Sequence, residues 1–135
     1  MVNPRIVICE YNSVFGCKDA VTIPYEPDFN RTKAHFSNLY FGASLPALCH
    51  LANKKGYIFI GSNSAGNNAF FIREDFAKLF KEVTVKEGYI MSNIRESRDE
   101  KGKLTYISGD DRKEMIKNLE VYNVKTDKKI KIRDL

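Results

Sequence analysis

The sequence predicts an α/β fold, in which helices cover a sheet of short apolar strands. Three segments are apolar at successive positions, residues 5–11, 57–62 and 69–73, which is typical of strands whose two faces are both covered. Residues 44–55, between the first two segments, have the spacing of an amphipathic helix. A strand, a helix and a strand in this order predict a right-handed parallel crossover.

The predicted helix at residues 44–55 has clear signals at both ends. Ser44 can cap its N-terminus, and Pro46 falls in the first turn, where a missing N–H group does no harm. Gly56 can adopt the left-handed conformation that ends a helix. The apolar positions lie on one face of the helix and are Leu45, Leu48, Cys49 and Ala52.

The stretch "SNSAGNN" at residues 62–68 predicts a turn, because glycine and asparagine tolerate positive φ. The strand at residues 69–73 is therefore expected to run antiparallel to the one before it. A phosphate-binding loop is the alternative, but the stretch lacks the GxxxxGK[ST] lysine and a following helix.

The remaining residues predict smaller elements. Residues 73–83 indicate a short amphipathic helix, 104–107 a short strand and 109–119 another helix, and residues 120–132 alternate around Thr126 and Asp127 as a hairpin does. We expect a partial α/β domain at residues 1–83 and a basic C-terminal extension at residues 84–135.

The long connection over residues 13–40 is the most promising place for a ligand. Nearly thirty residues separate the first strand from its helix, where a few are usual. Ligands of open α/β sheets bind beyond the carboxyl ends of the strands, and this connection begins at such an end. We therefore expect Asn12, Arg31, Lys33 and Tyr40 to contact a substrate.

Two residues are candidates for acid–base chemistry. Glu10, at the carboxyl end of the first strand, can bind a substrate hydroxyl or act as a base; the alternative is that it pairs with Lys33 or Arg31. His35 can transfer protons near neutral pH, or it can serve only as a hydrogen-bonding group.

Polar residues near the end of the second strand are further candidates for substrate contacts. They are Asn63, Ser64 and Asn68. Their alternative role is to cap and close the turn. No set of nucleophile, base and orienting residue emerges from the sequence.

Composition narrows the classes of protein. No run of 18 apolar residues suits a membrane helix, and no signal peptide is evident, so we expect a cytoplasmic protein without a membrane partner. Three cysteines in no CxxC pair do not favour disulfides or a metal site. Residues 101–135 hold ten Lys and Arg against six Asp and Glu, but the interspersed acids favour a solvated face over nucleic-acid binding.

Four stretches, in order along nearly the whole chain, resemble the C-terminal half of FkbM-type proteins: "NPRIVICEYNSVFG", "AVTIPYEPDF.RTKAHFSNLYFGASL", "KGYIFIGSNSAGNNAFFIRED" and "RESRDEKGKLTYISG". That family is similar to class I S-adenosylmethionine-dependent methyltransferases and is often encoded among surface-polysaccharide genes. The resemblance implies a Rossmann-like sheet ordered 3-2-1-4-5-7-6. Residues 5–11, 57–62 and 69–73 would be strands 5, 6 and 7, with strand 7 antiparallel.

The resemblance does not extend to the family's cofactor-binding half. The Gly-containing loop, the acidic ribose-binding residue and the "D.DG.D" stretch of that half have no counterpart here, so no cofactor-binding residue can be transferred to this sequence. S-adenosylmethionine is implied only for the complete fold. We expect a substrate-side half, not catalytic alone, acting on a carbohydrate or nucleotide-sugar acceptor. Its partner, an N-terminal half or a second copy, would pair with the strand edge from Ile6 to Cys9. The alternative is a truncated or non-catalytic binding module that uses the same edge.

Overall fold

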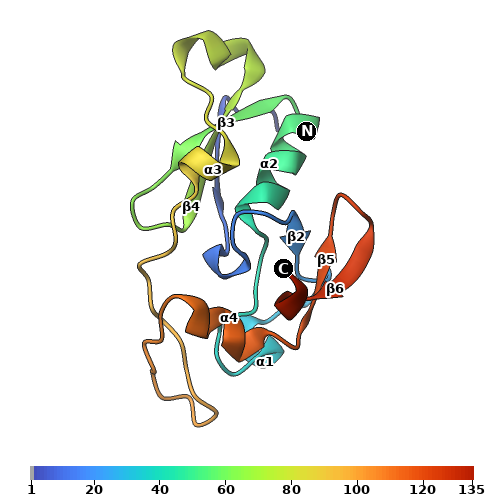
Figure 1. The fold of residues 1–135 in the computed structure, drawn as a ribbon. Coiled ribbons are helices and arrows are strands. Elements are labelled where there is room, and N and C mark those ends of the chain that lie inside the picture. The colour runs from blue at the N-terminus through green and yellow to red at the C-terminus, as the bar shows by residue number, and fades with distance from the viewer. Residues whose placement is uncertain (1) are drawn as a thin grey trace.

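The computed structural model describes residues 2–135, which form two three-stranded sheets (Figure 1). The first sheet has the order β1-β4-β3, with β1 at Ile6–Glu10, β4 at Asn68–Arg73 and β3 at Tyr57–Ser62. The second has the order β2-β5-β6, with β2 at Val21–Thr22, β5 at Glu120–Asn123 and β6 at Lys128–Lys131. The chain is therefore a mixed α/β domain.

The central strand of the first sheet, β4, is antiparallel to both neighbours. The predicted reversal of the chain after β3 is thus confirmed, and β1 and β3 run in the same direction, although β4 separates them. Val7 lies opposite Phe71, and Ile58 lies opposite Ile72. A bulge interrupts the β3–β4 register between Phe59 and Gly61.

Helix α2, Leu45–Lys54, connects β1 to β3 and covers one face of the first sheet. The predicted cap is confirmed, because the Ser44 side chain accepts from the Ala47 N–H and Pro46 lies in the first turn. Gly56 has a φ of 75°, as the predicted helix end requires. A second short helix, α3 at Val85–Gly88, packs on the same strands, with Gly88 directly against the Phe59 ring.

The opposite face of β1 is exposed, which contradicts the expectation of a strand covered on both faces. Val7 and Cys9 face the α2 side and join its apolar cluster. Ile6 and Ile8 point the other way and are 53% and 60% exposed. Among residues 2–135, no strand pairs with the outer edge of β1.

The second sheet draws on both ends of the chain. β2 pairs with β5, and β5 forms the predicted hairpin with β6. Helix α4 at Asp110–Ile116 and the 3-10 turns η1 at Ser13–Phe15 and η3 at Ile132–Asp134 enclose its core. That core is made of Val14, Phe15, Val21, Leu39, Ile116, Val121 and Ile132.

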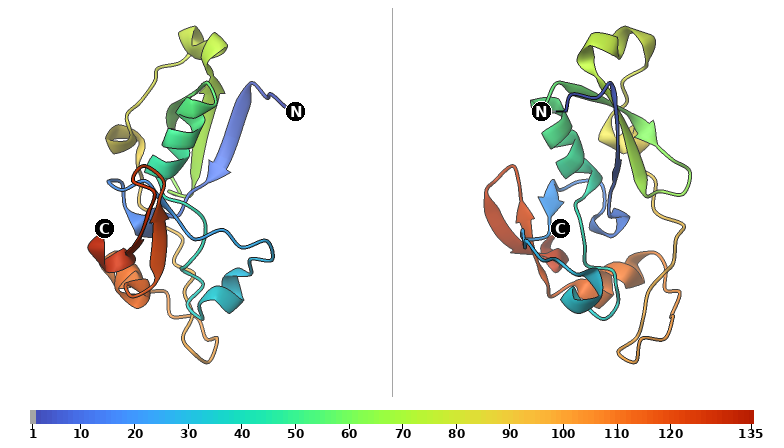
Figure 2. Two further views of the ribbon diagram at one scale, coloured as in Figure 1. Left: turned by 90° about the vertical axis from the view of Figure 1, so that its right-hand side faces the viewer. Right: turned by 180° about the vertical axis from the view of Figure 1, so that it is seen from behind.

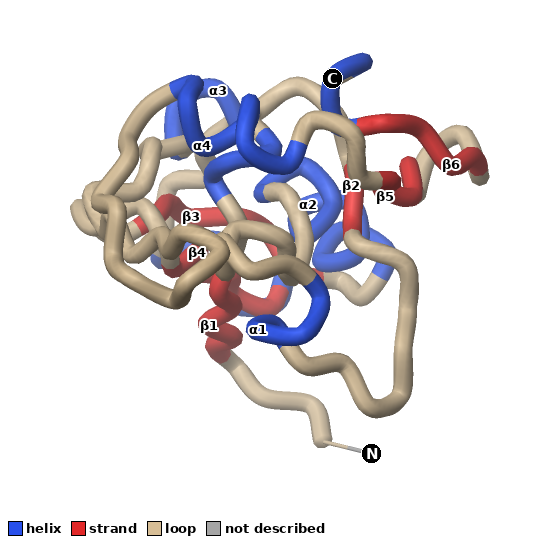
Figure 3. The backbone as a smooth tube through the Cα atoms, turned by 90° about the horizontal axis from the view of Figure 1, so that it is seen from below, coloured by secondary structure: helices blue, strands red, loops and turns tan. Residues whose placement is uncertain are grey.

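The core of the second sheet includes residues from both predicted parts of the chain. Val21 precedes the expected boundary at residue 83, and it shares this core with Val121 and Ile132. Figure 3, seen from below, shows β5 and β6 on the opposite side of the molecule from β3 and β4.

Several small elements differ from the sequence predictions. Residues 74–79 form a 3-10 helix, η2 at Glu74–Leu79, and Leu104 makes only an isolated bridge with Arg98 in place of a strand. Inside the long connection, α1 at Arg31–Ala34 and β2 were not predicted. Figure 2 shows this connection leaving the first sheet, contributing β2 and returning to α2.

Candidate functional site

A polar cavity of about 180 Å³ lies at the carboxyl end of β1. Four parts of the chain form its walls: the end of β1 with η1, the long connection, the β3–β4 turn and the segment that leads into α4. Its lining residues are Glu10, Tyr11, Asn12, Ser13, Val14, Arg31, Leu39, Phe41, Asn67, Ser92, Ile94, Glu96 and Arg112. Three of the predicted site residues, Glu10, Asn12 and Arg31, are thus brought together.

Asn12 fastens the long connection to the end of β1. Its Nδ2 group donates to the carbonyls of Leu39 and Phe41, at 2.8 and 3.0 Å, and its Oδ1 accepts from the Val14 N–H at 3.0 Å. The side chain is buried, and these bonds use its donors and one acceptor. Asn12 therefore shapes the cavity wall from within the protein.

Arg31 is held in a fixed orientation at the start of α1. Asn30 caps this helix by accepting from the Lys33 N–H. The Arg31 Nε donates to the Asn38 carbonyl at 2.5 Å, and the guanidinium lies 3.9 Å from the centre of the Phe41 ring. Stacking on an aromatic face leaves the edge of a guanidinium available for hydrogen bonds.

Arg112 is the most unusual residue of the cavity. It lies on α4 and is only 3% exposed. Its Nη1 donates to the Ile94 carbonyl over a long 3.4 Å, its Nε has no acceptor, and no carboxylate among residues 2–135 forms an ion pair with it. Burial lowers the pKa of this guanidinium, yet arginine stays charged in proteins.

The sequence prediction missed Arg112 because the surrounding "GDDRKEMIKNL" looks like a solvated helix. One signal was present, since Arg112 lies four positions before Ile116 and therefore shares its helix face. Ile116 belongs to the core of the second sheet. An arginine on the buried face of a helix is uncommon without a partner.

Two carboxylates also line the cavity. Glu10 is exposed, and neither Lys33 nor Arg31 is among the ion-pair partners found in the described part of the chain. Glu96 lies 3.4 Å from Arg98, which is also partly exposed. The cavity thus has acidic groups as well as two guanidinium groups.

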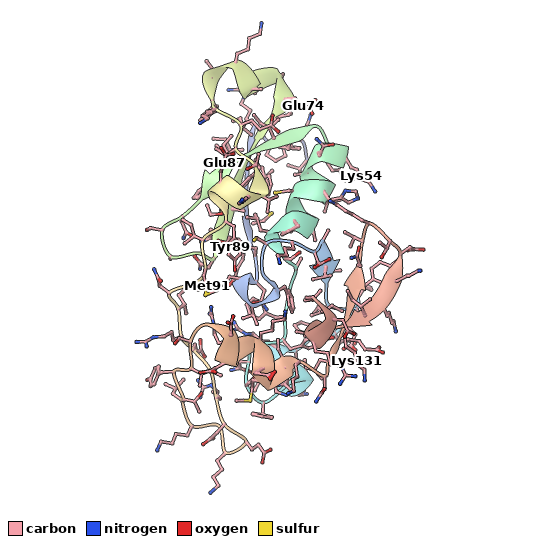
Figure 4. All side chains as sticks on the ribbon, viewed as in Figure 1. Lys54, Glu74, Glu87, Tyr89, Met91 and Lys131 are labelled. Carbon is pink, nitrogen blue, oxygen red and sulfur yellow. The ribbon has the colours of Figure 1, made fainter. Side chains whose placement is uncertain are left out.

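Two tyrosines hold the segment after α3 against the site. The Tyr11 hydroxyl donates to the Ile90 carbonyl at 2.6 Å, and the Tyr89 hydroxyl donates to the Ser13 carbonyl at 2.7 Å. Figure 4 shows Tyr89 and Met91 on this segment beside η1. Burial raises the pKa of Tyr89 to about 12, so its hydroxyl stays a donor at neutral pH.

The other predicted site residues lie elsewhere. His35 shares a 2.7 Å hydrogen bond with the Ser37 hydroxyl, and burial lowers its pKa. Lys33 is exposed, and the Tyr40 hydroxyl donates to the Glu120 carbonyl of β5.

The polar residues after β3 close a turn. The Asn63 Oδ1 accepts from the N–H groups of Asn67 and Asn68, and Gly66 has a φ of 71°. Ser64 is exposed, and its carbonyl accepts from Asn93. These contacts are those of a closed turn, which is the alternative role that the sequence predicts for these residues.

The cavity lining includes residues that donate and residues that accept hydrogen bonds. Arginine side chains supply donors and positive charge, and glutamates supply acceptors for hydroxyl groups. The described cavity lining holds no nucleophile hydrogen-bonded to a base.

No protein-family model, curated protein or solved structure is similar enough to the chain to match it. Over residues 2–135, none of the helices has the length and apolar character that crossing a membrane would require.

Proposed function

We propose that this chain is the substrate-side half of a methyltransferase-like protein and that another chain or segment, carrying the S-adenosylmethionine site, completes it along β1. The strand order β1-β4-β3, with β4 antiparallel to both neighbours, carries the proposal. It is the 5-7-6 order of the sheet that the FkbM resemblance implies. The α2 connection from β1 to β3 agrees with the same scheme.

The S-adenosylmethionine site itself does not fit the described residues. Such a site needs a Gly-containing loop between a strand and the start of a helix. Gly61 and Gly66 lie instead in a bulge and in the turn between β3 and β4. We therefore assign the cofactor to the completing part.

The outer edge of β1 supports a completing strand. Within residues 2–135 the edge is unpaired, and edge strands of this kind can pair with another chain. On one face it exposes Ile6 and Ile8. On the α2 face an apolar groove of about 180 Å³ runs beside the strand, lined by Val7, Cys9, Leu48, Leu51, Ala52, Lys55, Tyr57 and Phe71.

Both faces next to β1 therefore have apolar surface for the elements of a larger sheet. A helix connected to a strand beside β1 would cover Ile6 and Ile8, and a helix beside α2 would fill the groove. Leu51, 53% exposed on α2, would be covered by that helix.

In this proposal the cavity at the carboxyl end of β1 is the acceptor side of the active site. Ligands of open α/β sheets bind at this edge. The acceptor is a carbohydrate or nucleotide-sugar, as the resemblance implies. The role of this chain is to position the acceptor, which methyl transfer needs for in-line geometry.

The proposal is tested by placing a photo-crosslinking amino acid at Ile8 and expressing the protein in its native cell. We expect a crosslink to a segment that has a Gly-rich loop, and calorimetry should detect S-adenosylmethionine binding to that complex but not to the isolated chain. A crosslinked partner that does not bind S-adenosylmethionine, or the lack of any crosslink, would contradict the proposal.

The second candidate is a non-catalytic module in which two copies pair through β1. The observation that favours it is the same open edge, since antiparallel pairing of two identical edges forms a symmetric dimer. Light scattering at increasing protein concentration measures the molar mass and so distinguishes a dimer of this chain from a monomer. A dimer that Ile8→Lys dissociates would support this candidate, and a monomer throughout would exclude it.

A further inference from the structure

We propose that the cavity at the end of β1 binds a small oxyanion, a carboxylate or phosphate group, between Arg112 and Arg31. Arg112 of α4 and Arg31 of α1 both line this one cavity. The inference stands on these side chains alone and does not depend on the proposed function or on the family resemblance.

The first reason is the unpaired charge of Arg112. A buried charge is strongly unfavourable unless it is paired and hydrogen-bonded. Arg112 is 3% exposed, the only hydrogen bond of its side chain among residues 2–135 is the 3.4 Å contact with Ile94, and its Nε has no acceptor. An oxyanion supplies what this residue lacks, because two oxygens match the fork of a guanidinium.

The second reason is that Arg31 is already oriented for a ligand. Its Nε is used by the Asn38 carbonyl and its plane is stacked on Phe41. Less side-chain entropy is therefore lost when its terminal nitrogens bind an anion. An arginine held only to stabilise α1 would not need to line the cavity.

The acidic groups restrict the ligand further. Glu10 and Glu96 line the same cavity and repel a highly charged molecule. They favour a ligand with one anionic group and neighbouring hydroxyls, because the hydroxyls can donate hydrogen bonds to the two carboxylates. The volume of about 180 Å³ corresponds to roughly six water molecules, which suits a small acid or a phosphate group with a few adjoining atoms.

A neighbouring cavity offers the main competing location. Arg112 also lines a second cavity of about 280 Å³, together with Lys18 and Lys113. The Lys113 Nζ there already donates to the Leu135 carbonyl at 2.8 Å. We assign the anion to the first cavity because Ile94, whose carbonyl accepts from the Arg112 side chain, lines that cavity and not the second.

The test is an NMR titration of the full chain labelled with ¹⁵N, following the Arg112 Nε–H signal and the backbone amides of Ser92 and Ile94. Sodium acetate and inorganic phosphate are the two probes, and sodium chloride at matched ionic strength is the control. We expect saturable shifts with at least one probe, and the probe that binds more tightly identifies carboxylate or phosphate as the preferred group.

Three variants locate the anion. Arg31→Gln, at a partly buried residue, is expected to weaken binding about tenfold, because one charge-assisted interaction is lost. Lys18→Gln removes an exposed charge from the neighbouring cavity and is expected to leave the affinity unchanged. Arg112→Met, which keeps the apolar volume, is expected to abolish binding, with folding checked by its amide spectrum.

Shifts with neither probe beyond the chloride control would overturn the proposal. The proposal would also be overturned if Lys18→Gln lowered the affinity for the anion and Arg31→Gln did not, because the anion would then lie in the other cavity. If Arg112→Met does not fold, the Arg31→Gln and Lys18→Gln pair still decides the outcome.

Discussion

The two sheets of the molecule differ in how completely their apolar residues are buried. The second sheet encloses its core, and Val21, Val121 and Ile132 have no exposed surface. The first sheet buries Phe71 and Phe59 under α2 and α3 but exposes Ile6 and Ile8 on its edge strand. Both sheets are three-stranded and antiparallel in every pair.

The difference lies in what covers each sheet. The small second sheet is surrounded by α4, η1 and η3, which come from both ends of the chain. The first has helices on the α2 side, and its other face is open along β1. Apolar character in a sequence thus predicts that a strand belongs to a core, but it does not predict that both faces of an edge strand are covered.

The largest effect is expected from a matched pair of isoleucine substitutions. Ile132→Ala removes a fully buried side chain and should lower the free energy of unfolding by about 2–5 kcal/mol. Ile8→Ala, at a residue 60% exposed, should change it by less than about 1 kcal/mol. Urea denaturation measures both, and equal losses would mean that β1 is covered in the protein as purified.

A smaller effect is expected where α3 packs on the first sheet. A methyl group at position 88 would lie 2.4 Å from Cε1 of Phe59, so Gly88→Ala should cost about 1–3 kcal/mol through overpacking. Phe59→Leu frees space at this contact, and the double variant should lose less than the two single losses combined. Additive losses in thermal or urea unfolding would contradict this contact.

The link between the two sheets depends on Asn12. Asn12→Ala leaves the buried carbonyls of Leu39 and Phe41 without this donor and removes the cap of η1. The expected loss is about 1–3 kcal/mol. Asn118→Ala, at an exposed position, is the control and should stay within about 0.5 kcal/mol. Hydrogen exchange should also become faster around residues 39–43 in Asn12→Ala only.

The smallest effect concerns pH. Burial lowers the pKa of His35 in the folded state below its usual 6.5. The unfolded chain therefore binds the proton more readily, and stability should decrease as pH falls below about 6.5 until it reaches the folded pKa. His35→Gln should flatten this part of the curve of unfolding free energy against pH. A slope unchanged by the substitution would show that other groups cause it.

The strands and helices with strong local signals could be predicted from the sequence. Tyr57–Ser62, α2 with its Ser44 cap and the hairpin of β5 and β6 are close to expectation, because spacing, caps and turns are local properties. β2 could not be predicted, since its two residues form a strand only by pairing with β5. The isolated bridge at Leu104 shows the reverse case, where strand-forming residues find no partner strand.

Part of the candidate site could also be predicted, because some of its residues have a clear local position in the sequence. Glu10 and Asn12 follow a strand directly, so their place at the sheet edge could be expected, and Arg31 lies in the long connection that starts there. Arg112 comes to the cavity through packing of α4, about eighty residues after Arg31 in the chain, which no local pattern indicates. His35 and Tyr40 belong to the same connection but make their contacts away from the cavity.

The pairing of β2 with β5 sets the order in which the protein can form during its synthesis. All strands of the first sheet lie within residues 6–73, so they are available while the ribosome is still adding the remaining residues. Val21 must wait for Asn123, more than one hundred positions later. Until then Val21 and Phe15 lack part of the core that buries them, and their apolar side chains are exposed during synthesis.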